Sequence, residues 1–138
     1  MAAENVEGTI THNGDIQLNG VNARGVYLYG TRVDTHADVT DTSTILVGGG
    51  FNAGTNTRNY GVWVQGSHAT ANVDGIVNLD GVGGIGVHAR QGGVIDLGNT
   101  AEVNFIGGSD QIGYFIHGNG SAINNVANDL DVSTDNST

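Results

Sequence analysis

The sequence is most informative at first through the residues that it lacks. It has no cysteine, which excludes disulfide bonds, thiolate metal ligands and a cysteine nucleophile. It has no proline but 24 glycines, so its many tight corners depend on glycine rather than on a rigid ring. No apolar run approaches the roughly 18 residues that a membrane helix needs, so we expect no membrane insertion of this segment.

Positive charge is also scarce. There is no lysine, and four arginines stand against 14 acidic residues, which gives a formal net charge of −10. Such a surface repels nucleic-acid phosphates and anionic lipids, so we expect no nucleic acid among the partners.

Helical periodicity is missing as well, because no window repeats apolar residues every 3.6 positions.

The chain does contain one pattern that recurs. The segments DIQLNGVNARGV (15–26) and GIVNLDGVGGIGV (75–87) share the order of a leucine and two Gly-Val pairs. In both segments the leucine precedes the second of these glycines by seven residues. A unit that recurs in this way buries its hydrophobic face by stacking on its own copies.

Four short segments alternate residues as β-strands do, and each follows a glycine. They are GVYLYG, GVWVQG, GVHARQG and GYFIHG, which begin at Gly25, Gly61, Gly86 and Gly113, at intervals of 36, 25 and 27 residues. Each interval holds further short strand-like stretches. About 25 residues with three short strands fit one coil of a parallel β-helix, and nothing could serve as the crossover helix of a βαβ unit. A β-sandwich or barrel is the rival, but neither explains why equivalent strands recur with the same pattern.

We therefore predict one all-β domain over residues 1–138, a β-helix of about four to five coils. The extra length of the longest interval falls at 48–60, where we expect a projecting loop. The residues after Leu130 open another coil and then stop, so we expect the chain either to be part of a longer solenoid or to have a polar frayed end. Equivalent positions form three inward columns: Val26, Val62, Val87 and Tyr114; Leu28, Val64, Ala89 and Ile116; Leu18, Val47, Leu79, Phe105 and Val132.

Short coils built from Gly-Val-aromatic-Val-x-Gly and Val-x-Leu-x-Gly, with Asn, Asp and Thr corners and no Cys or Pro, resemble passenger domains of bacterial autotransporters. The pertactin-like and self-associating adhesin types are the most similar, over roughly residues 7–132. The resemblance implies a right-handed parallel β-helix exported to the bacterial outer-membrane surface or secreted. No protease motif of that family is present.

Two outward columns follow from the same alternation and are the predicted binding residues. Rings and polar groups in a row stack on sugar rings or contact a protein. The alternative is that like residues merely stabilise the sheet or lie under a loop. The two columns are Tyr27, Trp63, His88 and Phe115, and, two residues further on, Tyr29, Gln65, Arg90 and His117.

No catalytic or metal-binding arrangement stands out. The five histidines have no close metal-type partner, and Asp34, Asp38 and Asp41 lack the spacing of a calcium loop, so we expect no metal and no cofactor. Many β-helices cleave acidic polysaccharides, but those sites usually combine several acids with Lys or Arg on one outer face, and this chain has no lysine and four scattered arginines. Glycoside hydrolysis would need two facing carboxylates, and no pattern pairs Asp80 with Asp96.

We therefore expect a non-catalytic surface or secreted domain that acts by binding. Its partner would be a host-cell protein, a glycan or another copy of itself, and unpaired coil ends could favour a homo-oligomer. The alternatives are a fragment of a polysaccharide lyase or hydrolase, and a structural spacer without a site.

Overall fold

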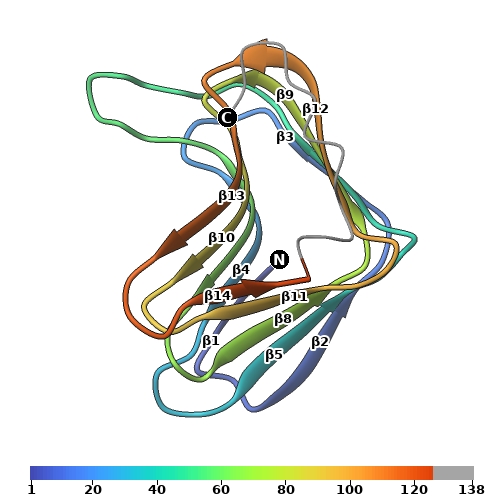
Figure 1. Ribbon diagram of the computed structural model, residues 1–138, viewed down its shortest axis with the longest axis vertical. Coiled ribbons are helices and arrows are strands. Elements are labelled where there is room, and N and C mark those ends of the chain that lie inside the picture. The colour runs from blue at the N-terminus through green and yellow to red at the C-terminus, as the bar shows by residue number, and fades with distance from the viewer. Residues whose placement is uncertain (126–138) are drawn as a thin grey trace.

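The structure is a computed structural model and describes residues 1–125. It confirms the predicted all-β parallel solenoid, with about five turns and no helix in that part of the chain (Figure 1). Strands of successive turns pair in parallel, which excludes the antiparallel sandwich and barrel. Within residues 1–125 no helix is available that could cross a membrane.

Every third strand joins the same sheet, so the solenoid has three sides. Sheet A contains β1 (Ala2–Glu4), β4 (Arg24–Tyr29), β7 (Tyr60–Gln65), β10 (Ile85–Arg90) and β13 (Ile112–His117). Sheet B contains β2 (Gly8–His12), β5 (Thr35–Val39), β8 (Ala69–Val73), β11 (Val94–Leu97) and β14 (Ala122–Asn124). Sheet C contains β3 (Asp15–Leu18), β6 (Thr44–Val47), β9 (Ile76–Val82) and β12 (Glu102–Ser109).

The strand registers confirm the three inward columns. Val26 pairs with Val62, Val62 with Val87, and Val87 with Tyr114. The second column of sheet A and the column of sheet C follow the predicted order in the same way. Most of these side chains are fully buried, whereas Ile116, in the last strand of sheet A, is half exposed. The predicted member Val132 lies outside the described residues.

The recurring glycine of the Gly-Val pair has a steric reason. A Cβ atom on Gly61 would lie 2.6 Å from the Gly86 carbonyl oxygen of the next turn and 2.7 Å from Val77 Cγ1. The same clash, at 2.6–2.7 Å from the next turn's glycine oxygen, would occur at Gly25 and Gly86. The backbones approach each other at these positions more closely than any side chain allows. The repeated glycine therefore sets the contact between turns.

The connection between β6 and β7 leaves the coil and extends away from it (Figure 1). Near its tip the backbones of Asn52 and Thr57 exchange two hydrogen bonds, of 3.1 and 3.2 Å. Its base is held by the buried Asn59, whose side chain accepts from the Ala23 N–H at 2.7 Å and donates to the Gly20 carbonyl at 2.7 Å. The loop is thus anchored to the preceding turn.

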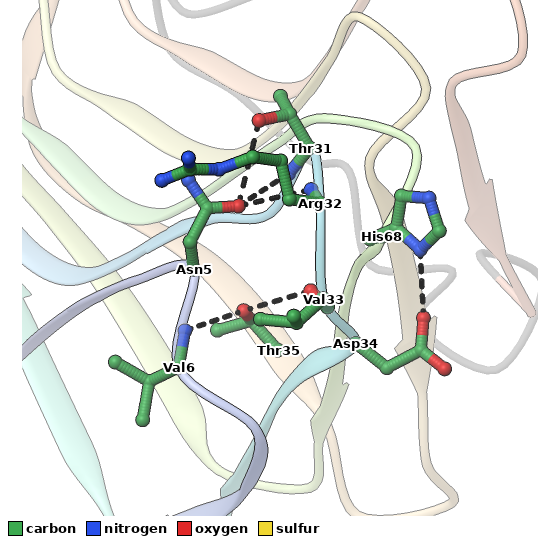
Figure 2. A network of polar contacts seen from close by, with 8 residues as sticks. All are labelled: Asn5, Val6, Thr31, Arg32, Val33, Asp34, Thr35 and His68. Carbon is green, nitrogen blue, oxygen red and sulfur yellow. Dashed lines mark hydrogen bonds and ion pairs between the residues drawn. The ribbon is translucent and has the colours of Figure 1, made fainter.

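Polar side chains join successive turns at the corner between sheets A and B (Figure 2). The Asn5 Oδ1 atom accepts hydrogen bonds from the backbone N–H groups of Thr31 and Arg32, at 2.9 and 3.0 Å. At the same corner, His68 of the following turn has its Nδ1 atom 2.9 Å from Asp34 Oδ1. These contacts satisfy corner groups that no strand pairing reaches.

Candidate functional site

The outer face of sheet A carries the two predicted outward columns, in the predicted register. Tyr27 pairs with Trp63, Trp63 with His88, and His88 with Phe115. In the second column Tyr29 pairs with Gln65, Gln65 with Arg90, and Arg90 with His117. Figure 1 shows sheet A as the side of the coil that bends inward beneath the projecting loop. All eight predicted binding residues therefore share one face.

The expectation that the whole row is exposed is wrong at its centre. Trp63 retains 7 % of its accessible surface and His88 3 %, while Phe115, in the last turn, retains 36 %. Strands in a sheet lie about 4.8 Å apart, so rings in register cover one another from both sides. The ring centres of Trp63 and His88 are 4.8 Å apart, and those of His88 and Phe115 are 4.6 Å apart. Only rings at the ends of the row keep an open side.

Two further residues, Arg24 and Tyr60, complete this cover, although the sequence pattern did not predict them. The Tyr60 ring centre lies 4.5 Å from that of Trp63 and 5.5 Å from that of His88. The Arg24 guanidinium lies 4.1 Å from the Trp63 ring centre and 4.6 Å from that of Tyr27, within the range of cation–π attraction. Both residues directly precede the recurring glycine, outside the predicted strands, and alternation alone would place them with the inward Val26 and Val62.

In the second outward column Gln65 is held by amide hydrogen bonds. The Trp63 indole N–H donates to Gln65 Oε1 at 3.2 Å, and Gln65 Nε2 donates to Gln91 Oε1 at 2.6 Å. Gln65 is thus oriented from both sides, and it fixes the rotamer of the indole. The face is a preorganised surface rather than a set of loose side chains.

His88 is a buried titratable residue at the centre of this face. Both ring nitrogens of His88 are buried and have no hydrogen-bond partner among the described residues. Burial lowers the pKa of His88 from 6.5 to about 4, and the nearby Arg90, His117 and Arg24 lower it further in that order. His88 is therefore neutral at pH 7, in a region of positive potential.

Carboxylates are missing from the four strands that build most of this face. Neither β4, β7, β10 nor β13 contains Asp or Glu, although the chain carries 14 acids. Neither of the two ion pairs within residues 1–125 involves an arginine. The buried Nε atoms of Arg24 and Arg90 have no acceptor in the same part of the chain. Basic groups are thus concentrated on strands without acids, while the one acid in the strands of sheet A, Glu4 in β1, lies beside Tyr29 at the edge.

The acidic residues singled out in the sequence lie apart. Asp34 pairs with His68 at one end of β5, whereas Asp41 follows its other end, about 20 Å away for an extended chain. Asp38, in β5, lies 2.9 Å from His36 Nε2. A hollow of about 640 Å³ between sheets B and C is lined by Asp38, Asp41 and Asp74 among others. No group of side chains within residues 1–125 is arranged to hold a metal ion.

The two carboxylates considered for glycoside chemistry also occupy different sides. Asp80 lies in β9 of sheet C, and Asp96 lies in β11 of sheet B. Asp96 accepts a hydrogen bond from Asn124 at 2.6 Å, within its own sheet. These two acids therefore do not face each other across a shared space, as a hydrolytic pair must.

No family model matches this chain. Neither the curated proteins nor the solved structures contain a significant match. What is established is the parallel solenoid itself and the face that it builds.

Proposed function

We propose that this chain is a secreted or cell-surface β-solenoid domain, of the autotransporter passenger kind, that acts by binding and not by catalysis. The observation that carries the proposal is the outer face of sheet A, with rings and basic groups in register on a rigid coil. The partner would be a host-cell protein or glycan, or another copy of the chain.

Two properties of the face support binding. Its central rings are locked by stacking, so little side-chain entropy is lost when a partner covers them. Its margin keeps partly exposed tyrosines, an amide and basic groups, which is the mixture that recognition surfaces favour. The accessible set is Tyr27, Tyr29, Tyr60, Gln65, Arg90, Phe115 and His117.

The proposal is tested with purified protein coupled to fluorescent beads. Adherence of the beads to cultured epithelial cells measures binding to a host surface, and clumping of the beads alone measures self-association. Phe115→Ser removes an exposed apolar ring of the face (36 %) and should lower one of the two readouts at least threefold. Ile106→Ser is the matched control, because Ile106 is an exposed apolar residue of sheet C (57 %).

The two variants separate the proposal from the spacer alternative. A spacer domain gives no adherence and no clumping with any variant. Equal losses with Phe115→Ser and Ile106→Ser would indicate nonspecific hydrophobic contact and would place the binding site elsewhere.

A further inference from the structure

The basic groups on sheet A form no ion pair with the described residues, and the one acid in the strands of this sheet, Glu4 in β1, lies beside Tyr29 at the sheet's edge. Two of the four arginines of the chain, Arg24 and Arg90, lie on this face, together with His88 and His117. Buried donors are normally paired, since an unpaired buried polar group costs about 1–3 kcal/mol. His88 is almost completely buried with both ring nitrogens unpartnered. The His88 nitrogens and the Nε atoms of both arginines are out of reach of solvent, so a ligand would meet the partly exposed remainder of Arg24 and Arg90.

The other arginines are in different surroundings. The Arg58 guanidinium donates to the carbonyls of Gly83 and Asp110, at 3.0 and 2.9 Å, and stacks on Phe51. Arg32 is exposed at the corner shown in Figure 2, close to Asp34 and Glu7. Arg24 and Arg90 therefore differ from the other two arginines, because they lie on a sheet face beside aromatic rings. The strands β4, β7, β10 and β13 of that face contain no Asp or Glu.

We propose that the outer face of sheet A binds an anionic oligosaccharide, whose carboxylate or sulfate groups pair with Arg24 and Arg90. This inference rests on the binding function proposed above and names its ligand class. Sugar hydroxyls would meet the hydroxyl groups of Tyr27, Tyr29 and Tyr60, and an apolar sugar face would stack on Phe115.

The positions of the two arginines require a ligand with several charges. Arg24 begins β4 and Arg90 ends β10, with β7 between them. Two strand spacings and the length of a six-residue strand separate them, about 10 Å across and 16 Å along the sheet. One carboxylate cannot reach both, whereas an oligosaccharide with an acid on successive sugars can. The surrounding net charge of −10 restricts such a chain to this one face.

A nucleic acid fits the same face less well. It carries one charge per nucleotide, and two arginines neutralise few of them against the repulsion of the remaining surface. Stacking of bases needs open ring faces, and the two central rings, Trp63 and His88, are buried. A saccharide needs fewer charges and more hydroxyl partners, which is what the margin of the face offers.

The test is calorimetric titration of the full 138-residue chain with defined probes. The probes are a galacturonate hexamer, a dextran sulfate oligomer and the neutral maltohexaose. We expect at least one anionic probe to bind, with an affinity that falls as salt rises, and maltohexaose to bind at least tenfold more weakly. The stronger of the two anionic probes distinguishes a carboxylate ligand from a sulfate ligand.

The variants locate the site. Arg24→Gln and Arg90→Gln should each weaken binding of the anionic probe about tenfold, the scale of a lost charged hydrogen bond. Arg32→Gln makes the same charge change at the corner of Figure 2 and should change affinity less than twofold. Arg24 packs on Trp63, so its variant is checked by thermal unfolding, and Arg90→Gln carries the test if Arg24→Gln does not fold.

Several outcomes overturn the inference. It fails if neither anionic probe binds, if the Arg24→Gln/Arg90→Gln double variant binds like the wild type, or if maltohexaose binds equally well. Tighter binding of polyglutamate or of a single-stranded oligonucleotide would assign the face to another ligand class. If beads adhere to cells through sheet A but neither anionic probe competes, the ligand class is wrong and the binding function stands. Absence of adherence as well would reject both.

Discussion

The outer faces of sheets A and B have the same backbone geometry but use their side chains differently. On sheet B a polar column alternates acid and amide, and each amide donates to a neighbouring acid. Asn72 Nδ2 donates to Asp38 Oδ1 at 3.1 Å, and Asn124 Nδ2 donates to Asp96 Oδ1 at 2.6 Å. The sheet B column therefore satisfies itself, and no two carboxylates are neighbours in it.

On sheet A the corresponding columns leave basic groups without acceptors. The rings stack on one another, but His88 and the Nε atoms of Arg24 and Arg90 find no partner among the described residues. The contrast teaches that a ladder of side chains is not by itself a sign of function. A ladder whose polar groups are mutually paired stabilises the coil, whereas unpaired buried polar groups are a free-energy cost to the folded chain.

The largest expected effect comes from breaking the turn-to-turn contact on which both faces depend. Gly61→Ala places a Cβ atom against the Gly86 carbonyl oxygen and Val77, and backbone atoms cannot move aside cheaply. We expect a loss of about 3 kcal/mol in the free energy of unfolding, measured by urea denaturation. Gly20→Ala is the control, because no atom lies within 4 Å of the added Cβ there. Equal losses in the two variants would contradict the steric explanation.

The second effect is acid destabilisation through His88 on sheet A. Its pKa is about 4 in the folded chain and 6.5 ordinarily, because of burial and then the nearby basic groups. Between these values the unfolded chain binds a proton that the folded chain excludes. The free energy of unfolding therefore falls as pH drops from 6.5 to 4, by on the order of 3 kcal/mol in total. Urea titrations at pH 7.5 and 4.5 measure the change.

The control for this prediction is His88→Phe, which keeps a ring in the column and removes the titrating group. The carboxylates titrate in both proteins, so the difference between them isolates the imidazole. The variant should lose less stability in acid, and at pH 7.5 it should be about 1 kcal/mol more stable because no buried nitrogen is left unpaired. An equal loss of unfolding free energy in both proteins would show that the folded chain does not exclude a proton from His88.

The third prediction concerns the ladder of sheet B. Asn72→Ala removes the hydrogen bond to Asp38, and the site is exposed, so we expect a loss of only about 0.5–1 kcal/mol in thermal or urea unfolding. Bead adherence and saccharide binding should not change, since this face is not the proposed site. A drop in binding without loss of stability would assign function to sheet B.

The smallest expected effect is optical and needs no substitution. Trp63 is the only tryptophan, and 7 % of its surface is exposed. Its emission should be blue-shifted and resistant to acrylamide, and a saturating anionic ligand should shift it only slightly. Emission near that of free tryptophan with efficient quenching would show that Trp63 is exposed to solvent, as the sequence predicted, and that the centre of the row is not buried.

Much of this architecture could be predicted because a solenoid repeats its own local rules. Alternation between glycines identified Val26, Val62 and Val87 as one inward column, and the registers agree. The same alternation placed the eight binding candidates on one face. It did not identify Arg24 and Tyr60, since these residues precede the glycine at which the predicted strand began. The pairing of Asp34 with His68 across 34 residues also had no local signal.

By itself the sequence determined the fold class, the coil repeat and the side of the sheet on which most strand residues lie. These follow from period-two alternation and from glycine, which are properties of neighbouring residues. Only the tertiary structure decided that Trp63 and His88 are buried although they point outward. Burial there depends on rings that stack across turns 25 to 36 residues apart and on the inward bend of sheet A. No local pattern contains that information, because accessibility belongs to the assembled surface.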